Sequence, residues 1–111
     1  MGEQGIIQDL YGLIVDRREK LPDGSYTSYL FKQGEDVILK KIGEETAEVI
    51  IAAKNKDAGG LAGEAADLVY HLLVLLAWRG LGPDDVLDVL AARFRSKQAA
   101  GGAGVKAGDE R

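Results

Sequence analysis

The chain has 111 residues, the length of one domain, and 46% of them are hydrophobic, so a globular core is feasible. Its formal net charge of −4 argues against a protein that coats DNA or RNA. There is no cysteine and only one histidine, which excludes disulfides, zinc–thiolate sites, cysteine nucleophiles and multi-histidine metal sites within one chain. The N-terminus lacks a signal-peptide pattern, and the longest strictly apolar run, Leu72–Trp78, falls short of the roughly 20 residues of a membrane span. We therefore expect a cytoplasmic protein that binds neither nucleic acid nor membrane.

The N-terminal part of the chain predicts two helices. Apolar residues spaced i, i+1, i+4, i+7 and i+8 from Ile6 predict an amphipathic helix over about residues 4–19. Residues 21–24, Leu-Pro-Asp-Gly, have the composition of a turn. Ser25 can then cap a short helix that ends near Gln33.

Two longer helices are predicted in the middle of the chain. The first covers about residues 35–55, although Val49–Ile51 alone would suit a strand. Asp57 can cap the second, which covers about residues 60–79. Nearly every residue of 68–78 is apolar, and a helix that is apolar all round is buried all round. One small domain can hardly surround such a helix, so we expect a homodimer or larger assembly, the alternative being a monomer with one central helix.

A fifth helix is predicted to begin at Pro83, with two aspartates in its first turn, and to end near Arg95. The last sixteen residues, 96–111, contain four glycines, four alanines and no aromatic residue, which predicts a mobile tail. No segment clearly indicates a sheet. The predicted fold is all-α, an antiparallel bundle of about five helices over residues 1–95 whose core is completed by homodimerisation.

Acidic residues gather on the two central predicted helices. Glu44, Glu45 and Glu48 share one arc of the first, and Glu64 and Asp67 lie one turn apart on the second. Fifteen residues separate Glu48 from Glu64, enough to finish one helix and start an antiparallel partner. Both groups can therefore lie at similar height on facing helices.

Carboxylates that face one another in this way need a neutralising partner. Two like charges about 5 Å apart repel by roughly 3 kcal/mol at an effective dielectric of about 20. Ligands that are all hard oxygens favour Mg²⁺ or Mn²⁺, and such ions usually take up substrate phosphates. The predicted chemistry is metal-assisted phosphate chemistry. The alternative is a solvated acidic face with Lys40, Lys41 and Lys54 as ordinary partners.

Other polar residues near the acids have two interpretations each. Lys40 and Lys41 precede the acids by about one turn and could meet phosphate oxygens, or they could be a surface pair. His71, one turn beyond Asp67, could bond a carboxylate or a phosphate, or could be a satisfied core residue. Tyr26 and neighbouring Thr27 could line a pocket. There is no phosphate-binding loop and no dinucleotide fingerprint.

Four segments resemble the phosphoribosyl-ATP pyrophosphatase family, and together the resemblance covers about residues 6–95. They are Ser-Tyr-Thr at 25–27, Lys-Lys-Ile-Gly-Glu-Glu-x-x-Glu-Val-Ile at 40–50, Ala-Ala-Lys-Asn at 52–55, and Glu-Ala-Ala-Asp-Leu-x-Tyr-His-Leu-Leu-Val-Leu-Leu at 64–76. The acidic spacing alone is typical of the wider all-α NTP pyrophosphatase group, with MazG-like enzymes and all-α dUTPases. The flanking Lys-Lys-Ile-Gly and Asp-Leu-x-Tyr-His narrow the choice, and the glycine-rich stretch 58–63 departs from the pattern.

The resemblance implies the second step of histidine biosynthesis, in which phosphoribosyl-ATP and water give phosphoribosyl-AMP and pyrophosphate. By similarity the metal ligands are Glu45, Glu48, Glu64 and Asp67, with Glu44 an additional candidate. Our hypothesis for the mechanism is that Mg²⁺, with Mn²⁺ as a possible substitute, binds these acids and activates the attacking water. One of Glu44 and Glu45 would act on the water as the catalytic residue, and the phosphates would be held by Lys40, Lys41 and His71.

One further expectation concerns a fusion partner, and two alternative functions stay open. A chain without cysteine should lack the zinc-dependent cyclohydrolase to which this activity is fused in some organisms. The first alternative is a house-cleaning (d)NTP pyrophosphohydrolase of the MazG-like or dUTPase group. The second alternative is a non-catalytic helical dimerisation module.

Overall fold

The computed structural model describes residues 5–99, which form five helices and no strand. In chain order the helices are α1 (Ile6–Lys20), α2 (Tyr26–Gln33), α3 (Glu35–Lys54), α4 (Ala58–Trp78) and α5 (Pro83–Ala99). The all-α prediction and the five predicted helices are confirmed. Residues 100–111, the greater part of the predicted tail, lie outside the described residues.

The helix ends follow the predicted capping residues. Ser25 Oγ accepts a hydrogen bond of 3.2 Å from the Ser28 amide at the start of α2. Asp57 Oδ1 accepts one of 2.9 Å from the Gly60 amide at the start of α4. The prediction that the fifth helix ends near Arg95 is wrong, because α5 continues to Ala99. The residues after Arg95, Ser-Lys-Gln-Ala, include no glycine or proline that would stop a helix.

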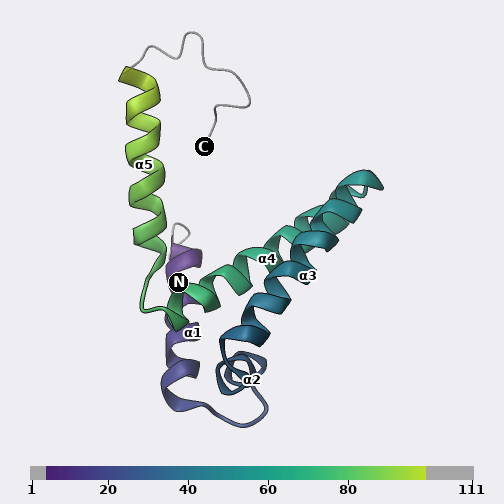
Figure 1. Cartoon of the computed structure of the whole chain (residues 1–111), viewed down its shortest axis with the longest axis vertical. Coiled ribbons are helices and arrows are strands. Elements are labelled where there is room, and N and C mark those ends of the chain that lie inside the picture. Colours follow the sequence, from purple (N-terminus) through teal and green to yellow (C-terminus); the bar gives the residue numbers. More distant parts are fainter. Residues whose placement is uncertain (1–4, 100–111) are drawn as a thin grey trace.

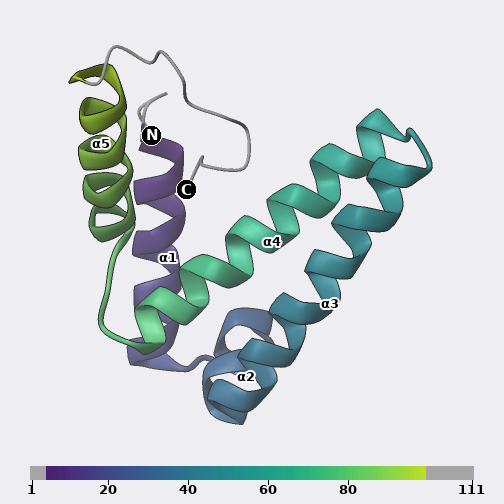
Figure 2. The same cartoon turned by 45° about the horizontal axis from the view of Figure 1, so that its top comes forward.

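Helices α3 and α4 form the long arm of the molecule. They lie side by side along their length, and the chain reverses between them at residues 55–57 (Figures 1 and 2). Helix α1 crosses the C-terminal half of α4, and α2 lies against the N-terminal end of α3 (Figure 2).

The hydrophobic core lies at one end of this arm, where α1 and α2 meet α3 and α4. Ile14, Leu30, Ile38 and Val74, one from each of these helices, have no exposed surface. Phe31, Leu73 and Ala77 complete the buried cluster. The other end of α3 leaves large apolar side chains uncovered, and Ile50 is 57% exposed. One chain therefore buries only part of the apolar surface that its helices carry.

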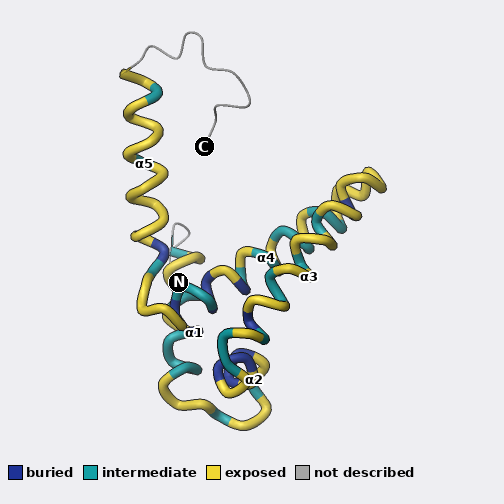
Figure 3. Tube along the Cα trace, in the orientation of Figure 1, coloured by how far each residue is buried: buried dark blue, intermediate teal, exposed yellow. Residues whose placement is uncertain are grey.

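Helix α5 contributes almost nothing to this core. It extends away from the α3–α4 arm, and nearly all of its described residues are exposed (Figures 1 and 3). Its large exposed apolar residues are Val86, Leu87, Val89, Leu90 and Phe94. Helix α4 is not buried on all sides within one chain either, because Val69 and Leu72 are each 41% exposed.

By length and composition alone, α4 could cross a membrane, since its best 18-residue window has a mean hydropathy of 1.4. The longest strictly apolar run in the sequence is shorter than the part of α4 that is apolar enough to cross a membrane, because most of the N-terminal half of α4 is alanine and glycine. Glu64, Asp67 and His71 lie well inside the sequence of α4, away from its two ends. Ionisable residues at such positions favour a core helix over a membrane span.

Candidate metal and phosphate site

Three of the predicted ligands come together between α3 and α4. Glu45 from α3 and Glu64 and Asp67 from α4 each offer a carboxylate oxygen, and these oxygens lie within 4.8 Å of one another. In the octahedral shell of one Mg²⁺ ion, neighbouring oxygens lie about 3.0 Å apart and opposite ones about 4.2 Å, since each is about 2.1 Å from the metal. Movements of at most about 1 Å by each side chain would thus bring the three within range of one ion. The donor set, three carboxylates with no nitrogen or sulfur, fits a hard divalent cation.

The electrostatics of Glu64 reflect this crowding. Partial burial raises the pKa of Glu64 above its usual value, and the charges of Glu48, Glu45 and Asp67 raise it further. Glu48 lies outside the group of three oxygens but within range of its field. Glu64 is therefore harder to ionise than an isolated glutamate, because burial and the charges of the other three predicted ligands act on it.

Three other predicted site residues lie on α3, and they differ in how close they are to the carboxylate cluster. Lys41 Nζ lies 3.1 Å from a Glu44 carboxylate oxygen and 4.0 Å from one of Glu45. The hydrogen bond to Glu44 is the main reason that the pKa of Lys41 is raised. Lys40 is exposed. The structure thus places Lys41 beside the acids and directs Glu44 toward Lys41 instead of into the group of three.

His71 is buried, with 5% of its surface exposed, and both of its ring nitrogens have partners. Nδ1 lies 2.7 Å from the backbone carbonyl oxygen of Asp67, which can only accept, so Nδ1 carries the proton. Nε2 therefore accepts a hydrogen bond of 2.9 Å from the Tyr26 hydroxyl. This pair, the Tyr26–His71 brace, joins α2 to the turn of α4 that carries Asp67.

A second contact between the same helices joins the hydroxyls of Thr27 and Tyr70. The sequence indicated Tyr26 and Thr27 as possible pocket residues but did not pair them with His71 and Tyr70. The available signals were the position of Tyr26 and Thr27 at the start of a short helix and the occurrence of all four residues in the segments that carry the family resemblance.

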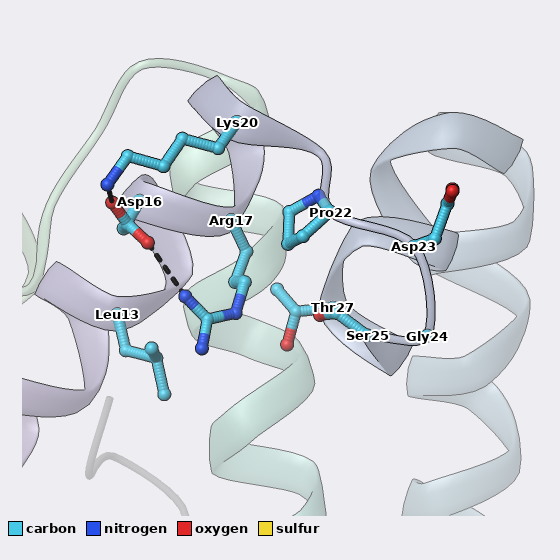
Figure 4. A pocket seen from close by; sticks show the side chains of 9 residues that line it. All are labelled: Leu13, Asp16, Arg17, Lys20, Pro22, Asp23, Gly24, Ser25 and Thr27. Carbon is cyan, nitrogen blue, oxygen red and sulfur yellow. Dashed lines mark hydrogen bonds and ion pairs between the residues drawn. The ribbon is translucent and has the colours of Figure 1, made fainter.

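A hollow of about 670 Å³ lies between the end of α1 and the start of α2, and no residue of the carboxylate cluster lines it (Figure 4). Arg17 and Lys20 line it, but each already lies 2.7 Å from a carboxylate oxygen of Asp16. Asp23, at its rim, is paired with Lys32 from outside the hollow. The lining has no surplus positive charge, so it does not favour a phosphate group.

An all-α fold with acidic residues facing one another on two helices is typical of one class of enzymes, the all-α hydrolases of phosphoanhydride bonds. Within that class, the chain belongs to the phosphoribosyl-ATP pyrophosphohydrolase family, whose sequence profile matches residues 7–94. The chain is accordingly an enzyme that hydrolyses a pyrophosphate bond.

Curated relatives agree with this assignment. Over 97 residues the chain is 71% identical to a phosphoribosyl-ATP pyrophosphatase of Pelotomaculum thermopropionicum, covering 87% of this chain and 99% of that protein. It is 50% identical over 88 residues to the enzyme of the same name from Streptococcus thermophilus, covering 79% of this chain and 85% of the relative. It is also 58% identical to the histidine biosynthesis bifunctional protein HisIE of Bacillus subtilis, over 80% of this chain but 43% of that protein. The family resemblance deduced from the sequence motifs is confirmed.

Proposed function

We propose that this protein hydrolyses phosphoribosyl-ATP to phosphoribosyl-AMP and pyrophosphate, the second step of histidine biosynthesis. Family membership and the names of the relatives support the substrate. The observation that carries the proposal at the site is the approach of Glu45, Glu64 and Asp67 to within 4.8 Å between α3 and α4. The rival (d)NTP pyrophosphohydrolase has no comparable support, because the matching profile is that of the phosphoribosyl-ATP enzymes.

We infer that the acids hold Mg²⁺, with Mn²⁺ as a possible substitute. Glu45, Glu64 and Asp67 would be direct ligands, and Glu48, which raises the pKa of Glu64 by its charge, would be the fourth. When bound, the ion would withdraw charge from the triphosphate and increase the acidity of a coordinated water. The crowded carboxylates support this role, because a divalent cation relieves the repulsion among them.

The reaction itself needs a water to attack the α-phosphorus while the bond from that phosphorus to the bridging oxygen of the β-phosphate breaks. A carboxylate would take the proton of the water, and pyrophosphate would leave with the bridging oxygen. Glu44 and Glu45 are the candidates for this base. Glu44 is the better one, because it lies outside the group of three carboxylates and is held by Lys41.

The cations and the histidine would steady the substrate. Lys41 lies within 4.0 Å of the acids and is well placed to meet a phosphate oxygen. Lys40, the preceding residue on the same turn, is exposed and would reach the outer phosphates. His71 could contact phosphate only after its bond to Tyr26 opens, since both ring nitrogens are engaged.

We further infer that a second copy of the chain completes the fold as an antiparallel bundle, in a cytoplasmic homodimer. The support is the apolar surface of α5, where Leu90 is 53% and Phe94 61% exposed, together with that of Val69 and Leu72 on α4. Helices in proteins gain most of their stability from tertiary contacts. Helix α5 makes few such contacts with its own chain. Burial against a partner would supply those contacts.

A substrate panel tests the proposed function. The purified protein is incubated with Mg²⁺ and either phosphoribosyl-ATP or each of the four dNTPs, and released pyrophosphate is measured. We expect kcat/KM for phosphoribosyl-ATP to exceed that for any dNTP. A preference for a dNTP would replace the proposal with the house-cleaning function. Release from none of the substrates would favour the non-catalytic module.

A further inference from the structure

Helix α2 carries two tyrosine rings on its outer face. Tyr26 is 46% and Tyr29 48% exposed, and their ring centroids lie 6.1 Å apart with an interplanar angle of 24°. The opposite face of the same helix is buried, through Thr27, Ser28, Leu30 and Phe31. A short helix fixed in the core thus presents a pair of nearly parallel aromatic rings to the outside.

This pair lies beside the carboxylate cluster. The Tyr26 hydroxyl bonds to His71, one turn of α4 from Asp67, and the Tyr26 ring lies 6.2 Å from that of Tyr70. Burial is the main cause of the raised pKa of Tyr26, but the charge of Lys41 lowers it and that of Glu45 raises it. Both charged residues belong to the metal and phosphate site, so the tyrosines flank that site at the end nearest α2.

We propose that Tyr26 and Tyr29 are the stacking platform for the adenine ring of the substrate. The inference rests on the proposed function, which places a nucleoside triphosphate with its phosphates at the carboxylate cluster. The nucleoside attached to those phosphates must then lie against a neighbouring surface. Tyrosine faces bind a base through its π-face, and stacking on a protein aromatic ring is a main source of nucleobase affinity.

The two tyrosines have different parts in the platform. The hydroxyl of Tyr26 is held by His71, which fixes the orientation of its ring. Tyr29 donates or accepts no hydrogen bond through its side chain among the described residues, so its ring is available for stacking without disturbing the fold. Tyr29 is therefore the residue at which the platform can be tested separately from the Tyr26–His71 brace.

The test compares Tyr29→Leu with Tyr29→Phe, which keeps the ring and removes only the hydroxyl. Each protein is titrated by calorimetry with ATP and with inorganic tripolyphosphate, both in Mg²⁺, because the two ligands share the triphosphate and differ in the adenosine. We expect Tyr29→Leu to weaken ATP binding by about 5- to 140-fold, and tripolyphosphate binding by less than about twofold. Tyr29→Phe should bind both within about twofold of the wild type. Equal weakening of both ligands, or unchanged ATP binding in Tyr29→Leu, would overturn the platform.

Turnover and light scattering separate the stacking role of Tyr29 from the proposed function and from a role in a subunit interface. In turnover, Tyr29→Leu should raise KM for phosphoribosyl-ATP over the same range while kcat stays within about threefold, since the ring lies away from the reacting phosphorus. If the wild type releases no pyrophosphate from phosphoribosyl-ATP, the proposed function fails, yet the comparison of ATP with tripolyphosphate still decides the platform. If light scattering shows that Tyr29→Leu lowers the mass of the assembly while Tyr29→Phe does not, the tyrosine belongs to an interface and the platform is overturned.

Discussion

The Tyr26–His71 brace gives a direct test of how α2 is held against the metal-site turn of α4. Tyr26→Phe removes one oxygen atom and leaves the ring in place, so the change isolates the 2.9 Å hydrogen bond to His71 Nε2. A typical hydrogen bond contributes about 0.5–1.5 kcal/mol, and leaving a buried partner unpaired costs about 1–3 kcal/mol. His71 is 5% exposed while Tyr26 is 46% exposed, so water can replace the hydroxyl only in part. We expect a loss of about 1–2 kcal/mol in the free energy of unfolding.

Urea unfolding followed by far-ultraviolet circular dichroism measures this loss, at a fixed protein concentration because assembly shifts apparent stability. Tyr29→Phe is the matched control, since it deletes the same atom from the same helix at a hydroxyl without a hydrogen bond among the described residues. It should change stability by less than about 0.5 kcal/mol. In a His71→Leu background, Tyr26→Phe should cost almost nothing further, because its partner is already gone. Equal unfolding midpoints for the two Phe variants, or full additivity with His71→Leu, would refute the brace.

Four other outcomes follow from the structure. In EDTA, the wild type should lose stability relative to Glu64→Gln as the pH rises from 4.5 through the raised pKa of Glu64. The reason is that folded Glu64 holds its proton more tightly than unfolded Glu64 does. A stability difference between the two proteins that stays constant from pH 4 to 7 in thermal unfolding would contradict this. Glu48→Gln should reduce activity at low Mg²⁺ and recover much of it at high Mg²⁺, whereas full activity at low Mg²⁺ would exclude Glu48 as a ligand. Lys56→Gly should stabilise the fold by about 0.5–1 kcal/mol in thermal unfolding, since exposed Lys56 has a φ of 56° that favours glycine; an unchanged or lower Tm would contradict that reasoning. Leu90→Glu on α5 should convert the proposed dimer to monomer in analytical ultracentrifugation, and a mass equal to that of the wild type would exclude α5 from the interface.

The sequence predicted most of the fold because its signals are local. Apolar patterns, capping residues and helix-favouring composition predicted the five helices, and Ser25 and Asp57 cap helices where the sequence places them. The error at the end of α5 has a local cause as well. Low apolar content after Arg95 suggested a tail, but Ser-Lys-Gln-Ala is compatible with a helix, so α5 continues to Ala99.

The candidate site was predictable in part. Helical geometry places Glu64 and Asp67 on one face of α4, and the turn at 55–57 returns that face toward Glu45. The separation of Glu44 from this group was harder to foresee, because adjacent glutamates on a helix point about 100° apart and only one of them can face the partner helix. Lys41, three residues earlier, then engages the other.

The pairing of Tyr26 with His71 could not be predicted from local pattern. The two residues are 45 positions apart, and their contact depends on how α2 packs against α4. From the sequence, His71 could bond a carboxylate or a phosphate, or could be a satisfied core residue. The structure places it in the core, bonded to a residue that lies next to the site.

A calorimetric titration with Mg²⁺ of the wild type, Glu64→Gln and Glu44→Gln tests whether the carboxylates between α3 and α4 hold a metal ion. We expect saturable binding to the wild type, affinity at least about 100-fold lower for Glu64→Gln, and affinity within about threefold of the wild type for Glu44→Gln, whose carboxylate lies outside the group of three. A wild type that binds no Mg²⁺ saturably, or a Glu64→Gln variant that binds it as well as the wild type, would contradict the claim that these helices hold the metal.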